Sequence, residues 1–229
     1  MVGPLITFFA PEAKGHGIPE ILKAIALRGG KIKPGMVLFK AVASIISIGS
    51  GFSVGREGPI AQVGAAFGSA FGQFLKVPAT LLKNLTACGV AAGIAGVFNT
   101  PIAGVMFASE VILRDFGASA LNTVVVAAVT SSIISRIYLG DHPSFSIPTY
   151  SLNNPLEILL YFGLGILAAL VAVFFMVVLE QAEIRFERWR FPDWLKPACG
   201  GLVIGCIGYI FPQVFGSGLT TIEAALHGS

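Results

Sequence analysis

Residues 156–179 form the stretch that most constrains the fold, because its only charge is Glu157, near its beginning. A membrane-spanning helix needs roughly 20 predominantly apolar residues, and this stretch supplies them. The chain has 229 residues, of which 55% are hydrophobic and 12% are charged, whereas soluble domains carry roughly 25% charged residues. We therefore expect an all-α polytopic membrane protein, in which residues 1–229 form a single transmembrane domain.

Glycine and proline divide the rest of the chain into apolar segments that we expect to be broken and tilted helices. These segments are residues 34–54, 59–75, 85–113, 123–139 and 197–210. Glycines recur at intervals of three or four in two of them, as Gly64, Gly68 and Gly72 and as Gly89, Gly93 and Gly96. One face of each helix would then carry no side chains, so that a neighbouring helix can approach it closely.

The charges and the cysteines argue against several classes of partner and cofactor. Lysine and arginine total 15 against 12 acidic residues, and this small, dispersed excess does not favour nucleic-acid binding. The three cysteines lack the spacing of a zinc site or a disulfide framework, and we expect neither a metal nor a cofactor. Basic residues gather at 28–33 and 185–196 but are absent from 140–155. Together with Arg114, which follows a helix end, this pattern predicts that these three basic groups face the cytoplasm, in a lipid bilayer that we expect to be the inner cell membrane.

Two short connections, GHGIPE at 15–20 and GREGP at 55–59, have the pattern of helix starts inside the membrane. In each, glycine precedes a proline suited to the first helical turn. Free N–H groups and the positive dipole ends of both helices would then point into one cavity. Such a cavity could bind chloride without a full positive charge. The alternative interpretation is a pair of ordinary glycine- and proline-rich loops at the membrane surface.

Glu57 lies between two long apolar segments, where a charged carboxylate needs hydrogen-bond donors. The available donors are the N–H groups that would hold the anion, so the carboxylate and chloride would compete for one place. Protonation of Glu57 would vacate that place, which predicts a gate that responds to pH and voltage. The alternative is a loop glutamate paired with Arg56, although adjacent residues of an extended segment point apart.

Three motifs together resemble the CLC family of chloride channels and chloride/proton exchangers, namely GHGIPE, GREGP and GIAGVFNTPIAGVMFASE at 93–110. The resemblance covers essentially the whole chain and implies the CLC fold, chloride as the transported anion, a homodimer with one pore per subunit, and Glu57 as the gate. It implies anion contacts at the two helix starts, at His16, Gly17, Ile18, Pro19, Gly55, Arg56, Gly58, Pro59 and Ile60. The family has a serine where His16 stands, and an imidazole could either replace that hydroxyl donor or become charged.

Other family features are expected to be missing or altered in this chain. Family members have a second, inverted half that contributes a GxFxP motif and a tyrosine to the anion site, and neither that motif nor a matching C-terminal helix occurs here. A partial CLC fold is therefore expected, which begins late in one family helix and stops before those parts. Residues 89–104 and 123–139 resemble the helices that line the family's dimer interface.

Val111 bears on the choice between a channel and an exchanger. By resemblance, the exchangers carry an inner proton-relay acid one residue after Glu110, at the position that Val111 occupies here. A valine cannot carry a proton, so the resemblance implies channel-like or uncoupled anion transport. The first alternative is a chloride/proton antiporter that uses another acid.

Two further alternatives come from different classes of protein. A non-conducting membrane subunit is consistent with the missing half. An intramembrane serine hydrolase would use the GxSxG pattern at 51–55, but His16 and His142 lie in glycine- and proline-rich connections and His227 lies at the C-terminal end. We therefore expect a protein that is not an enzyme and has no catalytic residues.

Overall fold

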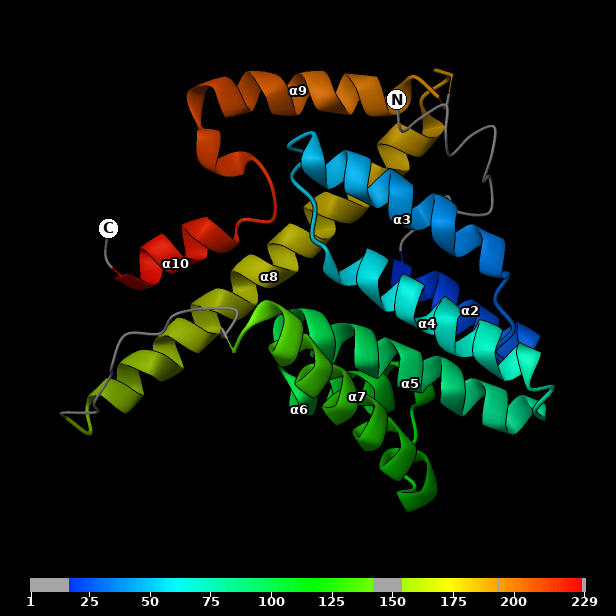
Figure 1. Ribbon diagram of the computed structural model, residues 1–229. Coiled ribbons are helices and arrows are strands. Elements are labelled where there is room, and N and C mark those ends of the chain that lie inside the picture. The colour runs from blue at the N-terminus through cyan, green and yellow to red at the C-terminus, as the bar shows by residue number, and fades with distance from the viewer. Residues whose placement is uncertain (1–16, 142–153, 193, 228–229) are drawn as a thin grey trace.

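The computed structural model describes residues 17–141, 154–192 and 194–227, and no β-strand occurs in these ranges. The expectation of an all-α fold is therefore confirmed (Figure 1). The elements are α2 (Gly17–Arg28), α3 (Pro34–Gly49), α4 (Glu57–Phe74), α5 (Ala79–Phe98), α6 (Pro101–Phe107), the π-helix η3 (Ala108–Leu113), α7 (Ala118–Leu139), α8 (Glu157–Arg188), α9 (Lys196–Ile210), the 3-10 helix η4 (Pro212–Val214) and α10 (Leu219–His227).

Glycine, asparagine and proline end the helices where the sequence changes character. Helix α3 stops at Gly49, and Gly51 follows with a φ of 86°. Helix α5 ends at Asn99, which adopts the left-handed conformation with φ 53° and ψ 36°, a common way to end a helix. Helix α6 then begins at Pro101, whose missing N–H costs nothing at a helix start. The predicted apolar segment 85–113 is therefore divided at Asn99 and Thr100 into separate helices.

The glycine faces of α4 and α5 meet directly. A Cβ atom added to Gly64 would collide with the carbonyl oxygen of Gly89, and one added to Gly89 would collide with that of Gly64. A Cβ atom added to Gly68 would likewise collide with the carbonyl oxygen of Leu85. Because the two backbones touch, the predicted close approach of a neighbouring helix is confirmed, and only glycine fits at these positions.

Hydrogen bonds to buried side chains fix the connection between α2 and α3. The Ser69 hydroxyl, fully buried on α4, donates to the carbonyl of Gly30 at 2.6 Å and accepts the N–H of Ile32 at 2.9 Å. Gln73 donates to the carbonyl of Ile32 at 2.9 Å, and Thr86 on α5 donates to that of Gly30 at 3.1 Å. The C-terminal end of α2 is thus attached to the α4–α5 pair, which orients α2 along α4.

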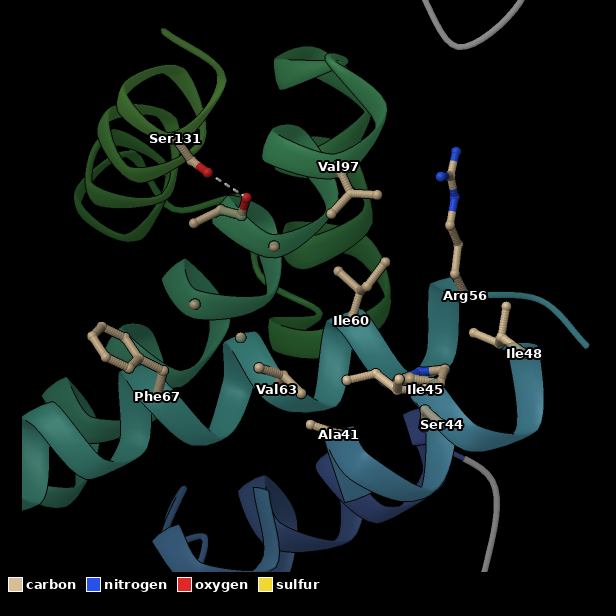
Figure 2. Close-up of a pocket in the computed structure, with 15 residues that line it drawn as sticks. Ala41, Ser44, Ile45, Ile48, Arg56, Ile60, Val63, Phe67, Val97 and Ser131 are labelled. Carbon is tan, nitrogen blue, oxygen red and sulfur yellow. Dashed lines mark hydrogen bonds between the residues drawn. The ribbon is translucent and has the colours of Figure 1, made fainter. Parts of the chain in front are cut away.

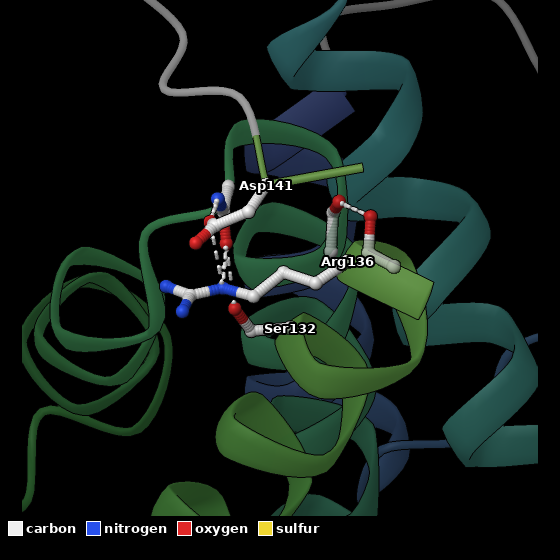
Figure 3. Close-up of polar contacts among 6 residues, drawn as sticks. Ser132, Arg136 and Asp141 are labelled. Carbon is white, nitrogen blue, oxygen red and sulfur yellow. Dashed lines mark hydrogen bonds and ion pairs between the residues drawn. The ribbon is translucent and has the colours of Figure 1, made fainter. Parts of the chain in front are cut away.

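A polar cluster holds the break after α5 against the end of α7 (Figure 3). Arg136 Nε donates to Asn99 Oδ1 at 2.7 Å, and the Ser132 hydroxyl donates to the same oxygen at 3.0 Å. The Asn99 amide in turn donates to Asp141 Oδ1 at 3.0 Å. The Asn99 side chain is thus hydrogen-bonded through both its oxygen and its nitrogen, and these bonds stabilise the residue in its left-handed conformation.

Three described helices, α5, α7 and α8, are long and apolar enough to cross a membrane. Helix α8 begins at Glu157 as expected but continues to Arg188, well past the predicted end at Leu179. None of its residues is buried, and Figure 1 shows its yellow-green first half projecting beyond the group formed by α2 to α7. An apolar helix without a protein covering needs a lipid environment, so the chain is a multi-pass integral membrane protein.

The remaining helices return to the α3–α4 connection. A Cβ at Gly201 of α9 would lie 3.2 Å from the Phe52 ring, and one at Gly51 would lie 3.5 Å from the Phe215 ring. Helix α9 matches the predicted segment 197–210, whereas α10 was not expected from the sequence. These aromatic contacts place the later helices beside the loop that leads into α4.

Candidate functional site

The first residues of α2 and α4 lie against each other, although they are far apart in the sequence. A Cβ added to Gly17 would lie 2.7 Å from the carbonyl oxygen of Gly58 and 3.0 Å from its Cα atom. Both glycines are half-buried. The two motifs that were expected to start helices at a common point therefore do so, and the absence of side chains at both positions permits the contact.

The helix starts leave specific N–H groups outside the helical hydrogen-bond ladder. Helix α4 begins at Glu57, two residues before the predicted Pro59, and Arg56 is its N-cap residue. The N–H of Ile60 donates to the carbonyl of Arg56 at 3.1 Å, so this donor is used within the helix. Pro59 has no N–H, and the N–H groups of Glu57 and Gly58 have no hydrogen-bond partner among the described residues. Two adjacent free donors with a positive helix-dipole end suit a small anion.

The Glu57 side chain folds back over its own helix start. A Cβ added to Gly55 would collide with Glu57 Oε2, so the carboxylate covers the glycine two residues before it. The side chain is exposed, and within the described parts of the chain it forms no salt bridge with Arg56. The carboxylate therefore lies near the end of α4 that carries the positive dipole.

Arg56 contacts the end of α5 instead. Its Cζ atom lies 5.0 Å from the centroid of the Phe98 ring, in a cation–π contact. The Nε atom is buried and has no hydrogen-bond partner in the described structure. Phe98 was not singled out from the sequence, and its place directly before the helix-ending Asn99 is the signal that could have indicated it.

A groove with a volume of about 530 Å³ runs along α4 beside this site (Figure 2). Arg56 and Ile48 lie at one end of it and Phe67 at the other. The Ser131 hydroxyl on its wall already donates to the carbonyl of Ala92 at 2.7 Å. Arg56, Pro59 and Ile60 line the groove, but its walls are mostly aliphatic. It is therefore poorly suited to a bare anion, which needs donors to replace its water.

Val111 lies in the π-helix η3, where it is half-buried, while the preceding Glu110 is exposed. Ser109, two residues before Val111, is fully buried, and its hydroxyl oxygen has no hydrogen-bond partner in the described structure. A π-helical turn holds more residues than an α-helical turn and is frequently found at functional sites. Residues 109–111 therefore point in directions that an α-helical register does not predict.

The remaining residues that the sequence analysis singled out lie in several different places. His16 and His142 lie outside the described residues. Ile18 and Pro19 are in the first turn of α2. Ser53 of the GxSxG pattern is on the exposed α3–α4 connection, without a strand before it. Among the described residues, no group of three or more histidine, cysteine, aspartate or glutamate side chains could hold a metal ion.

The class of protein follows from these features: a multi-pass membrane protein in which two helices begin at a shared, glycine-lined point. The family model described as voltage gated chloride channel matches residues 1–229. The chain belongs to this CLC family.

The relatives show how much of a family member's length the chain covers. A ClcB-like chloride channel protein of Ralstonia nicotianae is 34% identical over 92% of this chain and 50% of its own length. The H(+)/Cl(−) exchange transporter ClcA of Vibrio cholerae is 30% identical over 98% of this chain and 49% of its own length. The solved structure of a slow cyanobacterial Cl−/H+ antiporter matches with a TM-score of 0.84 and 26% identity, over 98% of this chain and 53% of that chain. The chain thus spans about half the length of these relatives and matches them with a partial CLC fold.

Proposed function

We propose that this protein transports chloride and similar small anions across the membrane, through a site where α2 and α4 begin. The observation that carries the proposal is the contact between Gly17 and Gly58, which brings the positive ends of two helix dipoles together. Membership of the CLC family and relatives named as chloride channels and exchange transporters support chloride as the ion.

The proposed site binds the anion with backbone groups. The N–H groups of Glu57 and Gly58 on α4 would contribute donors, together with those of Gly17 and Ile18 on α2. Neutral donors hold chloride less tightly than a lysine or arginine would, because no full positive charge is present. Weak binding suits transport, since a transported ion must leave the site as readily as it enters.

Glu57 is the proposed gate. Its carboxylate already lies over Gly55 at the start of α4, close to the donors that an anion would use. A small rotation of the side chain would bring the negative carboxylate to those donors and exclude chloride. Protonation removes the charge and the competition, so that a lower pH favours the open path.

Channel-like or uncoupled transport is the mode that we propose, because Val111 cannot relay protons from the inner side. The second candidate is a chloride/proton antiporter. It is favoured by the exchanger names of several relatives. The π-helical turn favours it too, because it gives the exposed Glu110 a direction that an α-helix would not.

The test is the simultaneous measurement of chloride and proton movement in proteoliposomes that contain the protein. An imposed chloride gradient should drive chloride flux without uphill proton movement. Uphill proton movement in a fixed ratio to chloride would contradict the channel-like mode and assign the protein to the antiporters. Chloride flux no greater than in protein-free liposomes would contradict the transport proposal itself.

We further propose that the protein forms a homodimer through α7. Its helical stripe of exposed apolar side chains, Val126, Ile133 and Ile137, points away from α5 and offers a surface for a second copy. The small buried residues Ala120, Val124, Ala128 and Ser132 lie on its opposite face.

A further inference from the structure

Helix α8 is longer than the membrane requires. Its 32 residues extend over about 48 Å at a rise of 1.5 Å per residue, whereas the hydrocarbon core is about 30 Å thick. Residues 158–179 carry no charge, and charged residues begin at Glu180. The part of α8 from Glu180 to Arg188 therefore lies at the level of the lipid headgroups or beyond.

Aromatic side chains gather at this end of the helix. The Phe186 and Trp189 rings meet edge to face with centroids 5.7 Å apart, and the Trp189 and Phe191 rings stack at 5.3 Å. Trp194 follows, and all four side chains are exposed. Tryptophan is enriched at membrane–water interfaces, because its ring is apolar and its N–H can contact water or headgroups.

Basic side chains surround the aromatic rings. Arg185, Arg188 and Arg190 are exposed, and no hydrogen bond or salt bridge engages them within the part of the chain that the structure describes. Lys196 Nζ donates to the carbonyl of Glu187 at 3.4 Å, which holds the lysine beside the helix end. Among the described residues, the nearby acids are Glu183, which has a partner, and Glu187, an exposed side chain; Asp193 belongs to the same segment of the sequence and lies outside the described residues. The three arginines have no partner within the described structure and so present their donors to an external anion.

We propose that this collar, defined as Arg185, Phe186, Arg188, Trp189, Arg190, Phe191 and Trp194, binds the phosphate groups of anionic phospholipids. Arginine presents paired N–H donors that match phosphate oxygens, and the stacked rings occupy the depth just below them. Lysine and arginine recur at 185–196 and are absent from 140–155, so the positive-inside rule places the collar at the cytoplasmic leaflet, where anionic lipids are found. The proposal depends on the membrane placement of α8 and is independent of chloride transport.

The chain offers a site-specific probe, because its only two tryptophans are Trp189 and Trp194. The protein would be reconstituted in vesicles that contain brominated lipid, which quenches nearby tryptophan fluorescence. Brominated phosphatidylglycerol should quench at least twofold more than the same fraction of brominated phosphatidylcholine. The triple variant Arg185→Gln, Arg188→Gln, Arg190→Gln should lose this preference, and high salt should reduce it.

Arg136→Gln is the matched control, because Arg136 is also partly exposed but lies on α7. This variant should keep the preference for the anionic lipid. Equal quenching by the two lipids in the unmodified protein would overturn the proposal, as would a preference that survives in the triple variant with normal helicity. Abolition of the preference by millimolar inorganic phosphate would assign the collar to a soluble anion instead.

Discussion

At the proposed anion site, the size of the side chains at Gly17 and Gly58 decides how closely the two helix starts can approach. The Gly17 position has no room for a methyl group, because the nearest obstacle is the backbone of Gly58 rather than a side chain that could move aside. Substitution would separate the helix starts by the width of the added group. The donors on α2 and α4 could then no longer contact the same ion.

The substitution Gly17→Ala should therefore weaken chloride binding. Overpacking costs about 1–3 kcal/mol, and about 1.4 kcal/mol corresponds to a tenfold loss of affinity. We expect the chloride dissociation constant, measured by calorimetry in detergent, to rise about tenfold. Gly163→Ala on α8 is the control, because a methyl group there meets nothing within 4 Å. An unchanged dissociation constant in Gly17→Ala would exclude the junction as the anion site.

Among the helices, α2 is held in place at its C-terminal end, where the following connection is hydrogen-bonded to α4 and α5. This attachment also sets where the N-terminal end of α2 lies. The fully buried Ser69 hydroxyl bonds both Gly30 and Ile32, so it fixes the connection that follows α2. Ser69→Ala would leave a buried carbonyl and a buried N–H with fewer partners.

Ser69→Ala should lower the free energy of unfolding by about 1–3 kcal/mol, the cost of leaving a buried polar group unpaired. Denaturant titration in detergent, followed by circular dichroism, would measure the loss. Ser119→Ala serves as the control, because Ser119 is exposed near the start of α7. Equal stabilities of the two variants would show that the attachment of α2 does not depend on this hydroxyl.

The features that allow close helix packing were easier to predict from the sequence than the positions at which helices begin or change type. Glycine spacing predicted that two helices carry faces without side chains, and the two proline motifs predicted that two helix starts point into one cavity. That these glycine faces pack on each other, and that Gly17 lies against Gly58, is seen only in the structure. The start of α4 at Glu57 could not be predicted, because it depends on the helical conformation of Arg56, whose side chain packs on Phe98 of another helix. The π-helical turn at Val111 could not be predicted from the sequence either. Its six residues are too few for the hydrophobic pattern to show a helical period different from that of an α-helix.

For the whole molecule, the exposed apolar face of α7 has a different role from that of α8. Helix α7 packs on α5 through small residues and hydrogen bonds, such as that from Ser131 to Ala92, so its outer face is held rigidly. A rigid apolar face suits a protein partner, whereas the isolated α8 suits lipid. We expect Val126→Trp to convert the proposed homodimer to a monomer, as measured by light scattering of the detergent complex.

The control for the dimer prediction is Leu164→Trp, which adds the same ring to an exposed position on α8. This variant should remain dimeric. A Val126→Trp protein that stays dimeric would move the interface away from α7, and an unmodified protein that is monomeric at all concentrations would contradict the homodimer.

The central claim is that the Glu57 carboxylate and chloride compete for one place at the start of α4. The measurement that tests it most directly is chloride efflux from proteoliposomes as a function of pH, for the unmodified protein and for Glu57→Gln, with Glu180→Gln on the exposed surface of α8 as the control. Efflux through the unmodified protein and through Glu180→Gln should rise as the pH falls, because protonation neutralises the competing carboxylate. Efflux through Glu57→Gln should be high and nearly independent of pH, since an amide carries no charge. A Glu57→Gln protein that retains the pH dependence of the unmodified protein would contradict the claim.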